Sequence, residues 1–336
     1  MNIWDKVPKD ILKQCSKLTE ARIFSSEVIR TIKEQLLPII KNHKSFALVF
    51  AGSLGRAEAL RTSDVDSFFL FGQNIGTKQK IFAHNIIKKL DNIVSQSSIG
   101  LRLASKGAFS CASTMKQLIS NIGGNEDTNE TLTRRMVTFT ESDGISSGYF
   151  FDSIKGEIIR AYLNDLAPER DRLPIFLIND LIRYYRTICI DYEYKKNKIR
   201  KPWAIRLAKL RHSRKLLYFS SLLPLFESIR VSSKNRIEWI ERQFLNYTPM
   251  ERMIILINKY GQRKHWDILL HYEMFLRYLS SEEKKKKLNK LTFANRDNCN
   301  EYIFLRDNAR DFRSILLDFA QSVPYWKENI RNYVIN

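Results

Sequence analysis

The stretch "SFALVFAGSLGRAEALRTSDVDSFFLF", residues 45–71, constrains the fold more than any other part of the sequence. It contains two compact apolar runs rich in β-favouring residues, which indicate two buried strands. Between them, Gly52 and Ser53 open a turn that leads into a short segment of helical character. Side chains two residues apart along a strand point to the same face, so we expect Asp64 and Asp66 to project together.

Two carboxylates held side by side repel each other and lose hydration unless a cation lies between them. Mg²⁺, or Mn²⁺ in its place, suits such a pair because it takes one or two carboxylates and completes its shell with water and phosphate oxygens. A turn that ends a buried strand offers free backbone N–H groups to an anion, and a glycine such as Gly52 lets the backbone approach a phosphate closely. The Ser53 hydroxyl can donate to the same phosphate. The motif therefore predicts a site for a nucleoside triphosphate and its metal ion.

The flanking sequence completes a small α/β unit. Apolar residues at helical spacing before residue 44 predict helices, and residues 77–96 predict an amphipathic helix. Residues 99–105, "IGLRLAS", predict a third strand. We expect an α/β domain (in the broader α+β sense) with a small mixed sheet and N-terminal helices over residues 1–150. Helical patterns interrupted by prolines predict an α-helical domain over residues 151–336.

The net charge of +20 predicts a polyanionic partner. Residues 195–215 hold ten Lys or Arg and no acidic residue, so half of the surplus lies in one segment. Such a segment is typical of a surface that binds nucleic acid or nucleotide phosphates. A solvated basic surface is the alternative interpretation.

The sequence gives no indication of a membrane segment. The longest apolar run, residues 216–226, is about half as long as a helix that crosses a bilayer. The first residues are charged throughout and show no signal-peptide pattern, and four scattered cysteines lack the spacing of metal or redox sites. We therefore expect a cytoplasmic protein without a membrane partner.

The run "GSLGRAE…SDVD" resembles the signature of the nucleotidyltransferase superfamily typified by DNA polymerase β. It is most similar to the domains related to protein-PII uridylyltransferase and to the nucleotidyltransferase group often linked to CBS domains. Residues 126–142 and 170–217 resemble later parts of those relatives, the second being their helical partner domain. Residues 230–336 resemble no family we can name.

The resemblance implies a Mg²⁺-dependent transfer of a nucleoside monophosphate from a nucleoside triphosphate to an acceptor, with release of pyrophosphate. It implies that Asp64 and Asp66 are metal ligands and that Gly52 and Ser53 hold the triphosphate.

Active members of the superfamily usually bring a third carboxylate from a later strand. The expected third strand offers Arg102 and no acid. Asp127 is then the first candidate, with Glu126 and Glu130 behind it. Alternatively, the site works with two carboxylates, or activation of the acceptor has been lost and the protein only binds nucleotide.

Further nucleotide-binding candidates are cations and one tyrosine, which can neutralise phosphate or stack on a base. They lie on the segment after the turn, on a polar and aromatic helical face, and in the basic segment. They are Arg56, Arg183, Tyr184, Lys201, Arg206 and Lys209. For each, the alternative is a structural position in the core or on a solvated face.

The charge favours an RNA acceptor, for instance a tRNA 3′ end, slightly over a protein acceptor. Similarity to the uridylyltransferases favours a protein acceptor. A nucleotide-sensing module without catalysis is a separate hypothesis, and a plain RNA-binding protein would leave the aspartate pair unexplained.

Overall fold

The computed structural model describes residues 2–72, 74–96, 98–104, 112–163, 173–199 and 202–335. The chain divides into two compact units. The first, here called the α/β unit, comprises residues 20–167 and 244–248. The second, here called the helical unit, comprises residues 1–19, 168–243 and 249–336.

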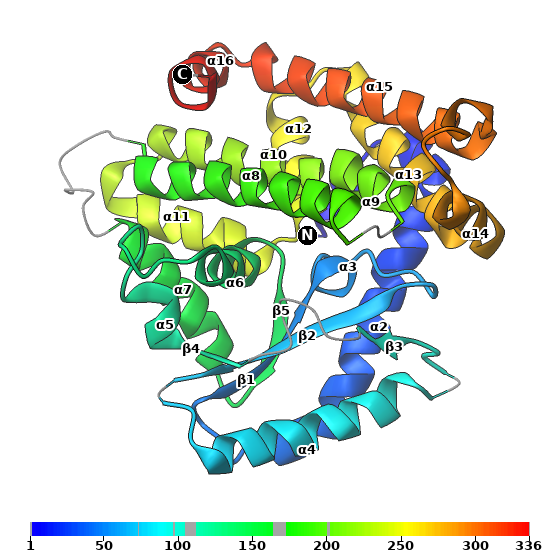
Figure 1. Cartoon of the computed structure of the whole chain (residues 1–336). Helices are drawn as coiled ribbons and strands as arrows, with labels where there is room; N and C mark the ends of the chain where they lie inside the picture. The colour runs from blue at the N-terminus through cyan, green and yellow to red at the C-terminus, as the bar shows by residue number, and fades with distance from the viewer. Residues whose placement is uncertain are drawn as a thin grey trace. The chain divides into compact units, whose positions relative to one another are not determined.

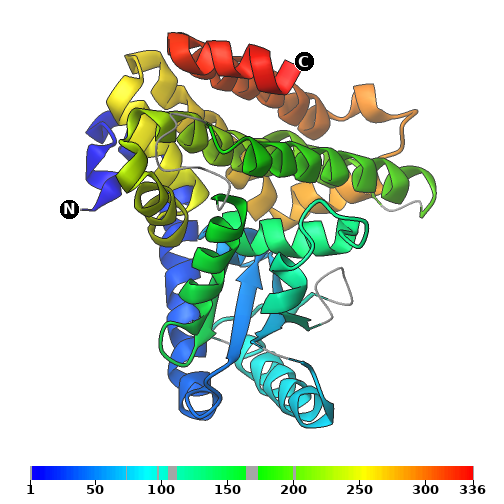
Figure 2. The ribbon, with the colours of Figure 1, turned by 90° about the vertical axis from the view of Figure 1, so that its left-hand side faces the viewer.

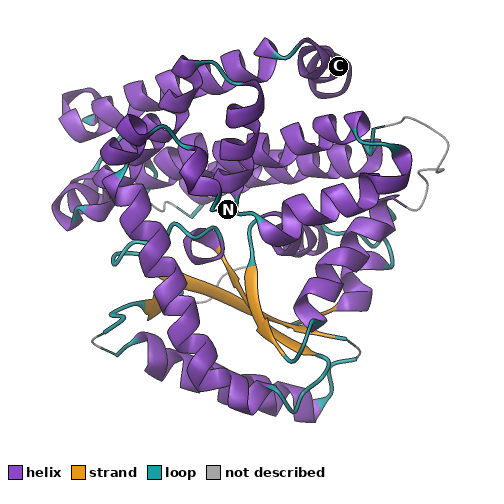
Figure 3. Ribbon diagram, turned by 180° about the vertical axis from the view of Figure 1, so that it is seen from behind, coloured by secondary structure: helices purple, strands orange, loops and turns teal. Residues whose placement is uncertain are grey.

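The α/β unit holds the strands of the described chain and the helices beside them (Figures 1 and 3). The strands are β1 (Phe46–Ala51), β2 (Asp64–Phe71), β3 (Arg102–Leu103), β4 (Ser113–Thr114) and β5 (Asp143–Ser146). The helices are α2 (Ser16–Ile40), α3 (Gly52–Gly55), α4 (Thr77–Val94), α5 (Met115–Ile119), α6 (Asn129–Thr140) and α7 (Phe150–Leu163).

The sheet has the order β3-β2-β1-β5, and β4 also pairs with β2. Strand β1 is antiparallel to both β2 and β5, whereas β3 and β4 run parallel to β2. The sheet is therefore mixed, which confirms the fold predicted from the sequence.

Strand β1 is buried along its whole length because helices cover both faces of the sheet. Leu48 and Phe50 share one hydrophobic core with Ile32 of α2 and Leu90 of α4. These two helices are blue and cyan in Figure 2. Helix α7 contacts the sheet so closely that a Cβ added to Gly144 of β5 would lie 2.8 Å from the Phe151 ring.

Three local features of the α/β unit differ from the sequence prediction. The third strand is confined to β3, and Ser105 of the predicted 99–105 strand lies outside the described residues. Helix α3 is a single turn, and Ala57, just beyond it, has a φ of 57°. Helix α6 is followed by a strand that the sequence did not indicate, β5, whose four residues pair with β1.

The helical unit consists of helices and connecting turns. Its α-helices are α1 (Lys9–Gln14), α8 (Ile175–Asn197), α9 (Ala204–Lys209), α10 (Lys215–Glu227), α11 (Ser233–Asn246), α12 (Pro249–Tyr260), α13 (Asp267–Ser280), α14 (Glu282–Lys290), α15 (Asn300–Ser322) and α16 (Pro324–Ile330). Short 3₁₀ segments are η1 (Ile3–Lys6), η3 (Ser228–Arg230), η4 (Arg263–Trp266) and η5 (Arg296–Asn298), and π-helical turns are η2 (Leu210–Arg214) and η6 (Arg331–Ile335). Within the described residues, no helix is both long enough and apolar enough to cross a bilayer.

The units divide at different positions from the predicted domains, 1–150 and 151–336. Residues 150–167 group with the sheet because α7 packs on it. Residues 1–19 group with the helical unit. There, the backbone N–H groups of Lys17 and Leu18 donate to the Glu273 carboxylate over 3.0 and 2.8 Å.

Candidate active site

The Gly-Ser turn and the two aspartates meet at one end of the β1–β2 pair. Their antiparallel register places Ala51 opposite Asp66, so the residue after Ala51 lies beside the carboxylate. That residue is Gly52, with a φ of 63°, and a Cβ added to it would lie only 2.5 Å from Asp66 Oδ2. Both the backbone conformation and the space require glycine here.

Asp64 and Asp66 occupy alternate positions at the start of β2 and therefore share one face of the strand. Val65 between them points the other way and is buried in the core. Asp64 is exposed and Asp66 half-buried. The half-buried Ser53 follows Gly52 directly, so the four residues predicted to bind metal and triphosphate lie at one edge of the sheet.

The neighbouring strand brings a cation to this edge. In the parallel β2–β3 register, Arg102 pairs with Asp64 and is exposed. The pairing continues as the Ala104 N–H donates to the Val65 carbonyl over 3.1 Å. No group of three or more His, Cys, Asp or Glu side chains suited to a metal occurs within the described residues. The described site is therefore two carboxylates and an arginine.

Arg56 holds the turn together and does not face solvent. Its guanidinium is buried and forms ion pairs with Glu58 and Glu141, the first with Nε 2.7 Å from Oε1. Gly55 lies so close to the backbone of Phe50 and Glu141 that any side chain there would collide with both. This geometry does not support the prediction that Arg56 binds phosphate. Glu141 is not among the residues predicted from the sequence, because it is 85 residues away from Arg56 along the chain.

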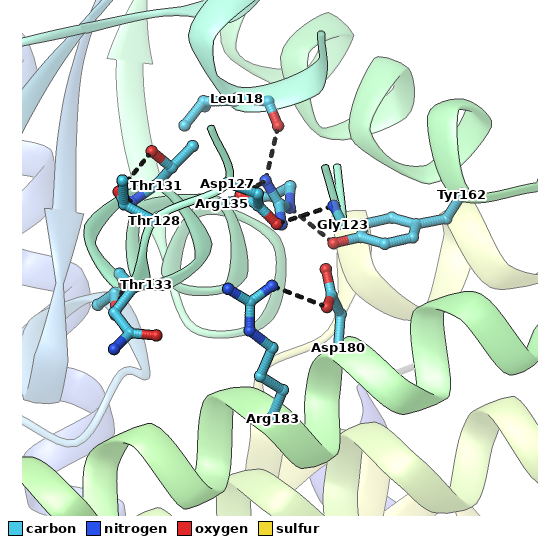
Figure 4. A network of polar contacts seen from close by, with 11 residues as sticks. Leu118, Gly123, Asp127, Thr128, Thr131, Thr133, Arg135, Tyr162, Asp180 and Arg183 are labelled. Atoms are coloured by element: carbon cyan, nitrogen blue, oxygen red, sulfur yellow. Dashed lines mark hydrogen bonds and ion pairs between the residues drawn. The ribbon is translucent and has the colours of Figure 1, made fainter. Parts of the chain in front are cut away.

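Asp127 is likewise enclosed (Figure 4). Arg135 of α6 donates from both terminal nitrogens to the two carboxylate oxygens, over 3.0 and 2.7 Å, and the Gly123 N–H donates to Oδ2 over 2.9 Å. The Arg135 Nε also donates to the Tyr162 hydroxyl on α7. The Asp127 side chain is 1% exposed. The prediction of Asp127 as a third metal ligand is thus not supported, because both of its oxygens already bind other groups.

The two reserve candidates differ from Asp127 in exposure. Glu126 and Glu130 are both exposed, and Glu130 pairs with Arg134 one helical turn away.

The remaining candidates lie in the helical unit. Arg183 forms an ion pair with Asp180 of the same helix, with 3.6 Å between Nη1 and Oδ1. Tyr184 is buried, being 4% exposed. Arg206 is half-buried and Lys209 exposed, whereas Lys201 lies outside the described residues. Their role in nucleotide binding stays a prediction.

A buried strand, a glycine-serine turn and an Asp-x-Asp strand edge are the features of a nucleotidyltransferase domain, and the N-terminal third of the chain is similar to such a domain. More particularly, residues 5–117 match the family described as "Putative nucleotidyltransferase DUF294". The match covers about a third of the chain and includes the turn, both aspartates and β3. A search of curated proteins found no match.

Proposed function

We propose that the protein transfers a nucleoside monophosphate from a nucleoside triphosphate to an RNA acceptor, such as a tRNA 3′ end, with Mg²⁺ or Mn²⁺ as cofactor. The observation that carries the proposal is the contact between the Gly52 backbone and the Asp66 carboxylate. It puts a surface that fits phosphate beside a carboxylate that fits a metal ion.

The residues present fit a magnesium ion. Asp64 and Asp66 supply two carboxylates from one strand face, which is the number of protein ligands that Mg²⁺ commonly takes beside a phosphate. Because Gly52 has no Cβ, the Asp66 carboxylate can lie directly against the turn that would hold the phosphates. The bound ion would neutralise charge on the phosphates and lower the pKa of the attacking hydroxyl.

The protein's own groups bind and orient the triphosphate in this proposal. Gly52 lets a phosphate oxygen approach the backbone, and the Ser53 hydroxyl donates a hydrogen bond to it. Arg102, opposite Asp64 on the neighbouring strand, supplies a positive charge for the same phosphates. The buried pairs of Arg56 with Glu58 and Glu141 keep the turn in place.

The choice of RNA as acceptor rests on charge. The net charge of +20 and the acid-free segment 195–215 favour a polyanion over a protein acceptor.

A second candidate is a module that binds nucleotide without transferring it. The observation in its favour is that Arg102, and not an acid, lies opposite Asp64. Within the described residues no third metal-ligating group joins the pair.

One assay separates these functions. The purified full chain is incubated with each of the four α-labelled nucleoside triphosphates and Mg²⁺, with and without total tRNA. Label in RNA supports the proposal, and label on protein moves the acceptor to protein. Nucleotide binding without transfer supports the second candidate, and no binding at all contradicts both. The matched control for the Asp64→Asn, Asp66→Asn variant is Asp91→Asn, Asp152→Asn, which removes two exposed acids of the same unit.

A further inference from the structure

The helical unit gathers cations from three segments that are distant in sequence. Arg211 of η2 and Lys215 at the start of α10 are one helical turn apart, and both are half-buried. Arg313 on α15 is exposed. The residue after Arg211 and the residue before Arg313 stack on each other, since the His212 and Phe312 rings are 5.5 Å apart with an interplanar angle of 23°. This buried contact brings Arg211 and Arg313 to the same region of the surface.

Helix α8 adds a fourth cation. Its Tyr185 ring lies 4.7 Å from the Tyr218 ring of α10, which fixes the two helices side by side (Figure 1). Arg186, the next residue, is exposed and close enough to Tyr218 to oppose the rise that burial causes in the pKa of that phenol. Arg186, Arg211, Lys215 and Arg313 are here called the cation cluster.

Among the described residues, no carboxylate pairs with the cation cluster. Within the described residues, none of its four members forms an ion pair with an acid. The pKa of Lys215 is lowered, first by burial, then by the positive charge of Arg313, with Arg211 acting in the same direction. Like charges held together in this way are destabilising until an anion binds between them.

Other cations on the same helices are paired, so the cluster is not typical of its surroundings. On α8, Lys195 pairs with Asp191. On α15, Arg306 and Arg310 both pair with Asp307.

An exposed stripe on α8 continues from the cluster. Arg186, Ile190 and Tyr194 recur every four residues and therefore lie along one side of the helix. Ile190 is 70% exposed and Tyr194 57% exposed, unusually high values for such large side chains. A tyrosine beside cations is the arrangement on which unpaired bases stack while their phosphates are neutralised.

We propose that the cation cluster and the α8 stripe bind a single-stranded segment of RNA, with phosphates on Arg186, Arg211, Lys215 and Arg313 and a base on Tyr194. The inference deepens the proposed function by naming the surface that holds the acceptor. A flexible strand has regularly spaced phosphates, which suit the cation cluster, and exposed bases, which suit the α8 stripe.

The test measures RNA binding without catalysis. A fluorescein-labelled single-stranded RNA is titrated with the full chain in EDTA and without nucleotide, and anisotropy is followed at several salt concentrations. For the variant Arg211→Gln, Lys215→Gln, Arg313→Gln, we expect a loss of affinity on the order of tenfold or more and a salt slope smaller by about 2. Tyr194→Ala should weaken binding roughly tenfold with little change in the salt slope.

The matched control removes three paired cations of the same unit, Lys264→Gln, Arg306→Gln, Arg310→Gln, with the same change in net charge. It should lose clearly less affinity than the cluster variant. Equal losses would overturn the inference, because bulk charge would then account for binding. The double variant Arg186→Gln, Arg313→Gln changes only exposed side chains, so it repeats the test if the triple variant misfolds.

The result is distinguishable from failure of the proposed function. Asp64→Asn, Asp66→Asn should bind the RNA as the wild type does while transferring no nucleotide. Wild-type protein that fails to bind the RNA would overturn this inference, even if it still labelled a protein acceptor. Equal affinity for a duplex RNA competitor would also overturn it, because the tyrosine needs an unstacked base.

Discussion

The α/β unit contains one aspartate, Asp127, and one aspartate pair, Asp64 and Asp66, whose surroundings differ. Asp127 is sealed, with both oxygens on Arg135 and one also on a backbone N–H. Asp64 is exposed at the start of β2, and Asp66 is half-buried with its carboxylate lying against Gly52. A carboxylate that already has a forked guanidinium partner contributes to structure, whereas two carboxylates that project from one strand face are suited to a shared cation.

The largest effect is expected for the Asp64–Asp66 pair. Changing Asp64→Asn and Asp66→Asn should reduce nucleotide transfer by roughly three orders of magnitude or more, because the metal ligands are removed. The melting temperature should fall by less than about 4 °C, because Asp64 is exposed, Asp66 is half-buried and Asn keeps the shape of Asp. Transfer rates and circular dichroism melts check both parts, and retention of activity would break the comparison.

Substitution of Asp127 should have the opposite result, a loss of stability without a loss of activity. Asp127→Asn leaves the buried Arg135 charge uncompensated and should lower the free energy of unfolding by about 3–5 kcal/mol. Transfer per folded molecule should be retained. Urea unfolding checks the first part, with the exposed Glu126→Gln as a control that should change stability by less than about 0.5 kcal/mol. Loss of activity without loss of stability would instead identify Asp127 as a metal ligand.

A sealed histidine extends the comparison to the helical unit. His212 is fully buried, its Nδ1 lies 2.9 Å from the Ala208 carbonyl oxygen, and Asn308 Nδ2 lies 2.9 Å from its Nε2. Burial lowers its pKa to about 4. The unfolded chain therefore binds this proton at a higher pH than the folded chain does, and stability falls as the pH drops from 6.5 to 4.

This loss should amount to about 3 kcal/mol at pH 4. Urea unfolding of the wild type and of His212→Gln across this range measures it, and the variant should show a flatter pH dependence. The exposed His84→Gln should follow the wild type. A wild-type curve no steeper than that of His212→Gln would contradict the sealed environment.

The smallest effect is expected for Gly52, which lies beside Asp66. Gly52→Ala would put a methyl group against the Asp66 carboxylate and should reduce transfer about 100-fold by displacing it. Gly100→Ala is the matched control, because Gly100 has a similar φ of 64° but no atom within 4 Å of the added Cβ. Both variants should lose stability because both positions have a positive φ, and only the first should lose activity. Equal activity in both variants would mean that Gly52 is needed only for its backbone conformation.

The sequence allowed the prediction of those features that depend on neighbouring residues. The two apolar runs became β1 and β2, and the position of the aspartates on one face follows from the period of a strand. The amphipathic pattern over residues 77–96 became α4.

Features set by tertiary contacts were not predictable. Strand β4 has two residues and β5 four, too few for a periodic pattern, and both exist because β2 and β1 pair with them. The partners of Arg56 and Asp127 depend on how α6 packs, which spacing alone does not give. For the same reason, Asp127 looked available in sequence and is enclosed in the structure.

The most direct test of the central claim is a crystal structure of the full chain with Mg²⁺ and a non-hydrolysable nucleoside triphosphate. We expect a cation bound by both Asp64 and Asp66, with the phosphates lying against Gly52 and Ser53. A triphosphate bound elsewhere, or a metal ion that ignores both aspartates, would contradict the account.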